Sequence, residues 1–412
     1  MQDTLGARYA WMAYAAICIM AVMWTGIQYN CMNLYAAPVV NDLGISRTQF
    51  MVVLSIPAVI SATVSLLCFG IVEERVGMRR MLLIGGVLNT LAFVSWFFMD
   101  SLAMLYLGGV LYGCGCSITA YNSVAAGVNR WFKQRIGSLM GTANAMGNVA
   151  GIVFAMVIAA LIATVGWRYS FGICVVFSAF STVACVALYK GNPRDLGVSA
   201  MYEDAAASEE RIGENAREAV GVPFKVALRM PRLWILAAGY FLLSMTSYGL
   251  MSTLPLFAVD LGFGQLQGQV VSASLLAAAV MMVPLGVMCD KLGTKWGLAL
   301  CGLLTMVAAV LLRLSSLPFV GMLVVAVCSG AAYSACAVTV GTGVKEAFGE
   351  VEFSKKLGLC SGCSYIGLAL GPALINLAYD SMGTYALALT AFILLTGVMV
   401  ALFFMGLRKP SV

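Results

Sequence analysis

Two loops of closely related pattern decide how this chain folds: residues 70–80 read GIVEERVGMRR, and residues 286–295 read GVMCDKLGTK. Each loop has a glycine, an acidic residue, a basic residue, a second glycine and a further basic residue. The positions that find a like residue 216 places later are Gly70, Glu74, Arg75, Gly77, Arg79 and Gly86. A repeat at constant offset indicates that the chain is a duplicated unit with two related halves.

The sequence around the loops is strongly apolar. Of 412 residues, 61% are hydrophobic and 10% charged, whereas soluble proteins carry roughly a quarter charged residues. Runs such as 51–71 and 320–344 are long enough to cross a bilayer core of about 30 Å. The first run begins near Trp11 without a basic segment or a cleavage site, so we expect a retained helix and not a signal peptide. The composition predicts an all-α integral membrane protein.

The apolar runs and their breaks predict twelve transmembrane helices in two pseudo-symmetric six-helix bundles. The predicted ranges are 11–37, 48–71, 81–99, 102–128, 137–164, 167–189, 233–258, 266–289, 296–314, 317–344, 357–379 and 384–407. We expect an N-terminal bundle at 1–190, a cytoplasmic linker at 191–232 and a C-terminal bundle at 233–412. The linker is acidic in its middle and basic over 224–233, which indicates a solvated tether ending in an amphipathic helix on the inner membrane surface.

The basic residues orient the helices. With both termini in the cytoplasm, only Arg47, Arg168 and Arg313 of the 24 Lys and Arg residues fall in outer loops. Cytoplasmic loops of membrane proteins carry such an excess of basic residues. The sequence therefore predicts a multi-pass protein of the cell (cytoplasmic) membrane with both termini cytoplasmic. Because the net charge of +6 reflects topology, we expect no nucleic acid as a partner. The expected partners are the lipid bilayer and a small-molecule solute, and we expect the protein to function as a monomer.

The repeated loop, the duplication, the helix number and the central linker together resemble the major facilitator superfamily over essentially the whole chain. The resemblance implies secondary transport by alternating access around a site near the bilayer midplane. It also implies that loop residues form a conformational latch: Gly70, Glu74, Arg75, Gly77, Arg79, Gly286, Asp290, Lys291 and Gly293. Glu74 stands where the family more usually has Asp. The alternative is that these residues only fix the topology and a tight turn.

The fifth helix narrows the resemblance. Residues 129–132 (Asn-Arg-Trp-Phe) precede Arg135, and the helix then carries Gly137, Gly141, Gly147 and Gly151. This pattern resembles the monocarboxylate and oxalate/formate porter branch, which implies an organic-acid substrate, and the glycines predict close helix crossings. Members of that branch often have a basic counter-charge in the eighth or eleventh helix. Here the eighth has none and the eleventh has only Lys356 at its start, so the resemblance brings no anion-binding residue.

The middle of the membrane is predicted to hold no charge. The chain has no histidine, and its outer acidic residues, Asp42, Asp100, Asp260 and Asp380, lie at helix ends. Intramembrane charge usually marks ion-coupled sites, so we expect uniport or exchange, or coupling through groups outside the midplane. The candidates for lining a substrate cavity are uncharged: Gln28, Tyr29, Tyr121, Asn122, Asn148, Tyr248, Tyr333 and Tyr365, with Thr25, Asn144 and Ser247 at similar depth. The alternative is that each hydrogen-bonds a neighbouring helix.

The 13 cysteines lie in the apolar runs or at their ends, where they are expected to be packing residues. Cys114 with Cys116 and Cys360 with Cys363 have metal-like spacing, but we expect no metal, no cofactor and no enzymatic activity. The function predicted is transport of a small organic solute, with mono- or dicarboxylates as the class that the resemblance favours. Efflux of amphipathic, drug-like compounds is one alternative, although the fourth helix lacks the arginine typical of proton-coupled drug antiporters. A non-transporting membrane sensor is the other.

Overall fold

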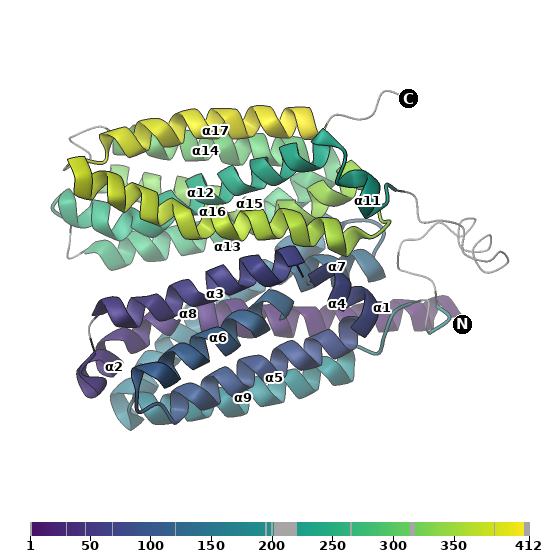
Figure 1. Cartoon of the computed structure of the whole chain (residues 1–412), viewed down its shortest axis with the longest axis horizontal. Coiled ribbons are helices and arrows are strands. Elements are labelled where there is room, and N and C mark those ends of the chain that lie inside the picture. Colours follow the sequence, from purple (N-terminus) through teal and green to yellow (C-terminus); the bar gives the residue numbers. More distant parts are fainter. Residues whose placement is uncertain are drawn as a thin grey trace. The chain divides into compact units, whose positions relative to one another are not determined.

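The computed structural model of the chain describes residues 2–29, 31–45, 47–67, 69–119, 121–193, 196–198, 201, 221–263, 266–313, 318–382 and 384–407, and these are almost entirely helical (Figure 1). The elements are α1 (Gln2–Ala21), a π-helical η1 (Val22–Tyr29), a 3-10 helical η2 (Met32–Tyr35), α2 (Ala36–Leu43), α3 (Arg47–Leu67), α4 (Phe69–Val76), α5 (Met78–Phe97), α6 (Leu102–Thr119), α7 (Tyr121–Trp131), α8 (Ile136–Val165), α9 (Trp167–Leu188), α11 (Phe224–Ala227), α12 (Pro231–Asp260), α13 (Gln267–Leu292), α14 (Thr294–Leu312), α15 (Phe319–Phe348), α16 (Phe353–Met382) and α17 (Ala386–Gly406).

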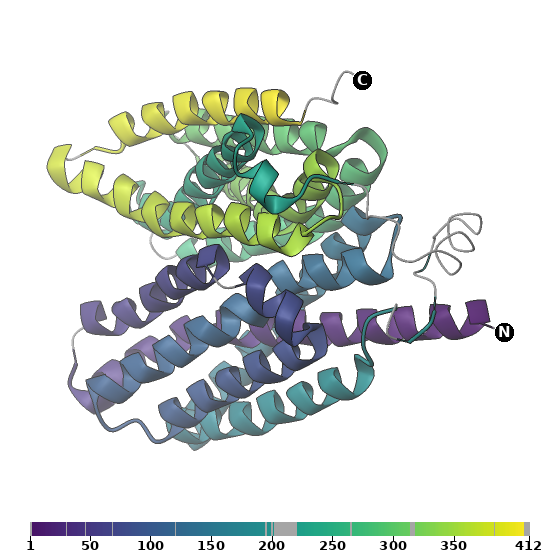
Figure 2. The ribbon, with the colours of Figure 1, turned by 45° about the vertical axis from the view of Figure 1, so that its right-hand side comes forward.

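These helices form two compact units. The first contains residues 1–136 and 146–219, and the second contains residues 137–145 and 220–412. The helix α8 is therefore shared, because its first turns group with the second unit and its remainder with the first. Within the first unit α5 packs between α6 and α9, and within the second α12 packs against α16 and α17 (Figures 1 and 2).

The helices have the length and composition of membrane spans. Within the described residues, 11 helices are long and apolar enough to cross a membrane, and Ile56–Leu67 of α3 is a shorter apolar helix at the position of the remaining predicted span. The apolar surface of the first unit agrees with this. Met156 on α8 is 64% exposed, and Val176 and Phe180 on α9 are each 70% exposed. Large apolar side chains that are this exposed on neighbouring helices suit contact with lipid better than contact with water.

The first span differs from the continuous helix predicted over residues 11–37. Here α1 begins at Gln2, and the α-helix gives way at Val22 to the π-helical η1, then to η2 and α2. A π-helical turn is wider than an α-helical one and breaks the regular hydrogen-bond ladder. The glycine at position 26 packs against α8, since a side chain there would lie 3.3 Å from the Gly147 carbonyl oxygen and the Gly151 nitrogen. Periodicity alone does not distinguish this arrangement from an ordinary helix.

Two further boundaries depart from prediction. The helix α16 begins at Phe353, four residues before the predicted start at 357. The amphipathic helix predicted over 224–233 is a single turn, α11, and the next helix already begins at Pro231. The Pro at 231 has no amide hydrogen and suits the first position of a helix, which explains why α12 starts there. The acidic middle of the linker lies outside the described residues.

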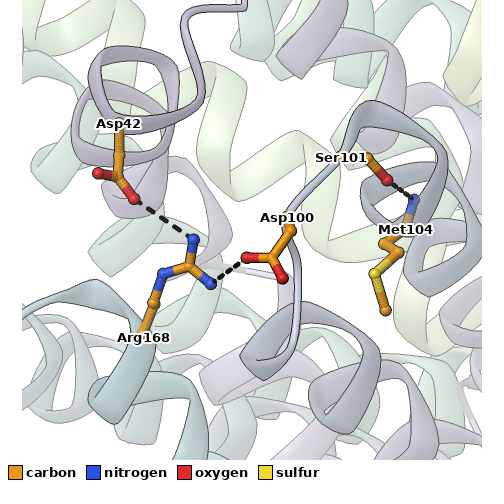
Figure 3. Close-up of polar contacts among 5 residues, drawn as sticks. All are labelled: Asp42, Asp100, Ser101, Met104 and Arg168. Carbon is orange, nitrogen blue, oxygen red and sulfur yellow. Dashed lines mark hydrogen bonds and ion pairs between the residues drawn. The ribbon is translucent and has the colours of Figure 1, made fainter.

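The first unit has a group of charged side chains at one end. At the predicted outer end, Arg168 lies between Asp42 and Asp100, with nitrogen–oxygen distances of 3.6 and 3.0 Å (Figure 3). The guanidinium also lies 4.5 Å from the centre of the Trp167 ring. All three charged side chains are at least 37% exposed, so each pair contributes only about 0–1 kcal/mol. Their grouping agrees with the prediction that these positions share one end of the bundle.

Candidate functional site

The second unit brings two of the predicted cavity residues together. Tyr248 of α12 and Tyr333 of α15 have ring centroids 5.4 Å apart with planes at 41°. Tyr333 is 4% exposed and Tyr248 is half-buried. Both lie near the middle of 30-residue helices, which places them at the centre of a span about 45 Å long. The pair therefore presents two phenol groups at the depth predicted for a solute site.

Hydroxyl groups accompany this pair along α12. Ser247 Oγ lies 3.3 Å from Thr305 Oγ1 of α14, and one turn earlier Ser244 donates to Cys336 Sγ of α15 at 3.5 Å and contacts Ser364 of α16. Both serines are fully buried. These polar contacts join four helices without a charged group, as interhelical hydrogen bonds commonly do in membrane proteins. They give Tyr248 a rigid support.

The third predicted residue of this unit, Tyr365, lies on α16 and is 7% exposed. It follows Ser364, whose hydroxyl contacts Ser244 of α12, so α16 carries both a polar contact to α12 and a phenol near its middle. Asn144, on the part of α8 that groups with this unit, donates to the carbonyl oxygens of Met140 at 2.9 Å and Ala337 at 3.4 Å. Asn144 therefore joins two helices, as the alternative interpretation of the candidates expects.

In the first unit the structure locates fewer of the predicted side chains. Asn122 is 1% exposed, and its amide donates to Ser65 Oγ of α3 at 3.0 Å. Asn148 on α8 is 6% exposed. The side chains of Gln28, Tyr29 and Tyr121 lie outside the described part of the chain, although their backbone is placed at the end of η1 and the start of α7.

The π-helical η1 adds a buried polar atom that has no hydrogen-bond partner within the described residues. The hydroxyl oxygen of Thr25 is unpaired although the residue is only 1% exposed. Broken helices with unsatisfied polar groups are how many transporters build midplane sites. From the sequence Thr25 is predicted only to lie at a similar depth, because no sequence pattern predicts a π-helical turn.

The second copy of the repeated loop forms a defined contact. The carboxylate of Asp290, at the end of α13, accepts hydrogen bonds from the amides of Gly137 at 2.7 Å and Ser138 at 2.8 Å, and from Ser138 Oγ at 2.6 Å. These amides are among the first of α8, where helical amides have no partner within the helix. A carboxylate here also interacts favourably with the positive end of the helix dipole. Asp290 is therefore an N-terminal cap for α8.

Two glycines allow this contact. A side chain at Gly137 would lie 2.5 Å from the Gly286 carbonyl oxygen, and one at Gly286 would overlap the Gly137 carbonyl. The backbones of α8 and α13 thus touch where the two glycines meet, as the sequence predicted for small residues at helix crossings. The turn within each repeated loop uses another glycine, because Gly77 and Gly293 have φ angles of 79° and 92°, which favour glycine.

The first copy of the loop is organised differently. Arg79 donates from Nε to the Val186 carbonyl oxygen at 3.2 Å, and Arg75, like Lys291 in the second copy, is exposed. The position of Gly70 is buried. The side chain of Glu74, the acidic residue of the motif, lies outside the described part of the chain. The latch role predicted for these residues stays a prediction.

Sequence reasoning missed the residue next to Glu74. Glu73 is 2% exposed and forms an ion pair with Arg130 at the end of α7, and Arg130 also donates to Asn192 Oδ1 at 2.8 Å. The conspicuous Arg130 of the fifth-helix pattern signals that an acidic partner is needed. Sequence alone does not show which glutamate supplies it.

Within the described residues, no cluster of three or more metal-ligating side chains occurs. The described cysteines, including Cys114, Cys116, Cys360 and Cys363, are free thiols.

Comparison with known proteins now gives the family. The family model of the major facilitator superfamily matches residues 13–271 and 264–412. Two structures of the E. coli fucose:proton symporter share the fold at 13% identity, covering 98% of this chain and 100% of theirs, with TM-scores of 0.69 and 0.70. The second of these is in the outward conformation.

Among curated proteins, monocarboxylate transporter 10 of Rattus norvegicus is 31% identical over 102 residues, which are 24% of this chain and 20% of that protein. The oxalate:formate antiporter of Oxalobacter formigenes is 31% identical over 140 residues, 33% of this chain and 32% of that protein. These matches thus span only a fifth to a third of the relatives' lengths. The family match covers nearly the whole chain and agrees with the duplicated loops and the helical fold. This chain has the apolar helices of a multi-pass membrane protein and belongs to the major facilitator superfamily.

Proposed function

We propose that the chain carries a small organic acid by alternating access, as a uniporter or an exchanger, and that the Tyr248–Tyr333 pair is part of its binding site. The observation that carries this proposal is the pair itself, two phenols near the middle of α12 and α15 with ring centroids 5.4 Å apart. Two relatives are named as a monocarboxylate transporter and an oxalate:formate antiporter, which supports the substrate class.

The chemistry of the pair fits a small, partly apolar anion. A phenol is protonated at neutral pH and can donate a hydrogen bond to a carboxylate oxygen. Its ring offers apolar surface to the rest of the solute. No lysine or arginine lies in the central turns of these two helices, so the anion would be held by neutral donors alone. Such a site releases its solute readily, which suits exchange between two sides of a membrane.

We further propose that the Asp290 cap on α8 is a conformational latch. The contact consists of three hydrogen bonds to one carboxylate, and water can replace each of them when the helices separate. The latch would thus contribute to one state of the transport cycle without making it permanent. The related positions Glu74, Arg75, Gly77 and Arg79 would act similarly in the first half.

The test is counterflow in proteoliposomes loaded with unlabelled oxalate, formate, lactate or pyruvate and assayed with the labelled acid outside. At least one acid should exchange without an imposed pH gradient. Tyr333→Phe removes only the hydroxyl and should raise the half-saturation concentration roughly 5- to 10-fold, since a hydrogen bond contributes about 1 kcal/mol. Tyr169→Phe is the matched control, because Tyr169 is 67% exposed on α9.

Two results would overturn the proposal. One is the absence of counterflow for every acid while the purified protein remains folded and monodisperse. The other is transport that is strictly dependent on an inward proton gradient. Changed drug sensitivity of a deletion strain, without acid exchange, would instead favour efflux of amphipathic compounds.

The proposed setting is the cytoplasmic membrane, with both termini in the cytoplasm and a monomeric protein. The placement of 21 of the 24 basic residues in inner segments supports this orientation. Labelling of single cysteines introduced at Tyr169 and at Lys225 checks it, because an impermeant reagent applied to cells should reach only the first. Labelling of the cysteine at position 225 in intact cells would reverse the orientation.

A further inference from the structure

The two halves begin their fifth helices in the same way but at different points of the repeat. The residues before α8 and α16 are Arg135 and Glu352, and both adopt left-handed φ angles, 57° and 43°. In the sequence, however, Gly137 corresponds to Gly358. Gly137 is the second residue of α8, whereas Gly358 is the sixth residue of α16. The helix α16 therefore has an extra turn, residues 353–356, at its start.

The extra turn changes what the repeated glycine can do. The amide of Gly137 is free of intrahelical bonds and is capped by Asp290. Only the first four amides of a helix are free in this way, so the amide of Gly358 lies beyond them and is used within α16. A carboxylate cap like that of Asp290 has no equivalent site at Gly358. Among the described residues, the start of α16 instead contacts the end of the central linker.

The contact with the linker end runs through a buried lysine. Lys356, in the extra turn, is fully buried, and its ammonium donates to the carbonyl oxygens of Val222 at 2.9 Å and Phe348 at 3.3 Å. The ammonium also lies 5.7 Å from the centre of the Phe348 ring. A buried ammonium is stable only when its hydrogens are used, so Val222 of the linker is one of its required partners.

Two more contacts hold the same stretch of linker. The amide of Val222 donates to the Phe348 carbonyl oxygen at 3.0 Å, and the amide of Phe224 donates to Glu352 Oε2 at 2.7 Å. Glu352 is itself paired with Lys355 at 2.5 Å. We call residues 221–224 with Glu352 and Lys356 the linker clip. Its contacts come from the side chains of Lys356 and Glu352 and from the Phe348 carbonyl at the end of α15, so the linker end and the start of α16 form one connected structure.

We propose that Lys356 is a positioning residue that fastens the end of the central linker to α16. The helix α16 then moves together with the linker end during transport. Tyr365 lies nine residues after Lys356 on the same helix, about 14 Å along its axis. The clip thus links the chain that joins the two halves to a helix that carries a candidate site residue.

The test uses Lys356→Met, which keeps most of the side-chain length and removes the ammonium. Hydrogen–deuterium exchange of the peptide covering residues 221–226 is the readout, because the two amide bonds of the clip, at Val222 and Phe224, do not involve Lys356 directly. If Lys356 fastens the clip, both amides should exchange at least 10-fold faster in the variant. The control is Lys225→Met, which removes an exposed ammonium from the same segment and should leave exchange unchanged.

Unchanged exchange at Val222 and Phe224 in a folded Lys356→Met protein would overturn the proposal. If that variant does not fold, Glu352→Ala provides the second test, since it should speed exchange at Val222 although the only linker contact that it removes is the one with the Phe224 amide. In counterflow, Lys356→Met should lower the turnover several-fold and leave the half-saturation concentration unchanged. Normal turnover in a variant whose Val222 and Phe224 amides exchange faster would refute the link to transport. The exchange measurement needs no substrate, so it remains decisive if the proposed substrate class is wrong.

Discussion

The contact between Asp290 and the start of α8 allows a quantitative prediction. Asp290→Ala removes the acceptor of three hydrogen bonds, from the Gly137 amide at 2.7 Å, the Ser138 amide at 2.8 Å and the Ser138 hydroxyl at 2.6 Å. Nothing else in the side chain changes beyond the loss of the carboxylate. The effect should therefore be confined to the first turn of α8 and to the end of α13 that it contacts.

The expected magnitude follows from the geometry. Loss of an N-terminal cap typically costs about 1 kcal/mol, and loss of a negative charge at the positive end of a helix dipole costs about 0.3–1 kcal/mol. Hydrogen bonds to a charged group contribute about 1.5–3 kcal/mol each, but Asp290 is exposed and water replaces part of that contribution. Because these contributions overlap, we expect a loss of roughly 2–3 kcal/mol for the contact. That corresponds to a change of about 30- to 150-fold in its closed-to-open ratio.

Hydrogen–deuterium exchange at Gly137 and Ser138 measures that ratio. Their amides should exchange about 30- to 150-fold faster in Asp290→Ala, and Asp290→Asn should lie between this variant and the native protein, because an amide oxygen can still accept one bond. The control is Lys291→Ala, which changes the exposed neighbouring residue of the same loop. Exchange at these two amides that is equal in Asp290→Ala and native protein would refute the assignment of Asp290 as a cap.

Three more predictions test the packing and charges. Gly286→Ala places a methyl group against the Gly137 carbonyl and should lower the free energy of unfolding by about 1–3 kcal/mol. Gly268→Ala is the control, because a Cβ there meets open space and should leave stability unchanged. Thermal unfolding of the two variants measures the difference. The hydrogen bond from Lys355 and the amide of Phe224 lower the pKa of Glu352 below its ordinary 4.5, so the contribution of Glu352 to stability should be complete above pH 4.5 and be lost only as the pH falls through that lowered value. A titration of thermal stability in detergent checks this, and loss of the Glu352 contribution between pH 5 and 7 would contradict it. Glu73→Gln removes the carboxylate partner of the partly buried Arg130 and should cost about 1–3 kcal/mol. The double variant Glu73→Gln with Arg130→Met should be more stable than Glu73→Gln alone.

Much of the fold could be predicted from the sequence because membrane spans carry a strong local signal. A helix in lipid must satisfy its own backbone groups, so long apolar runs identify α12 through α17 within a few residues. The first span was predicted less well. The π-helical turn at residues 22–29 depends on how Gly26 packs against Gly147 and Gly151 of α8, and such contacts between distant segments leave no periodic pattern.

The candidate site was predicted in part. Depth along each span can be counted from the sequence, and the structure places Tyr248 and Tyr333 in ring contact at that depth. Asn144 shows the limit of the same reasoning, since its amide group hydrogen-bonds the Met140 and Ala337 carbonyls between two helices. A polar residue at mid-depth has the same sequence signal in both roles. Only the positions of the neighbouring helices distinguish them.

The sequence by itself determined the number of helices, their duplication and the family. Hydrophobic length, charge asymmetry and the two repeated loops can each be recognised along the chain without knowing which helices are in contact. Only the tertiary structure decided which equivalent residues of the repeat act alike. Asp290 caps α8 because Gly137 lies at that helix's start, while Gly358 lies one turn inside α16 and the buried Lys356 holds the linker end there instead. The repeated sequence motif does not show that α16 begins four residues earlier in the repeat than α8 does. That starting point nevertheless determines which backbone amides remain free to bind a partner.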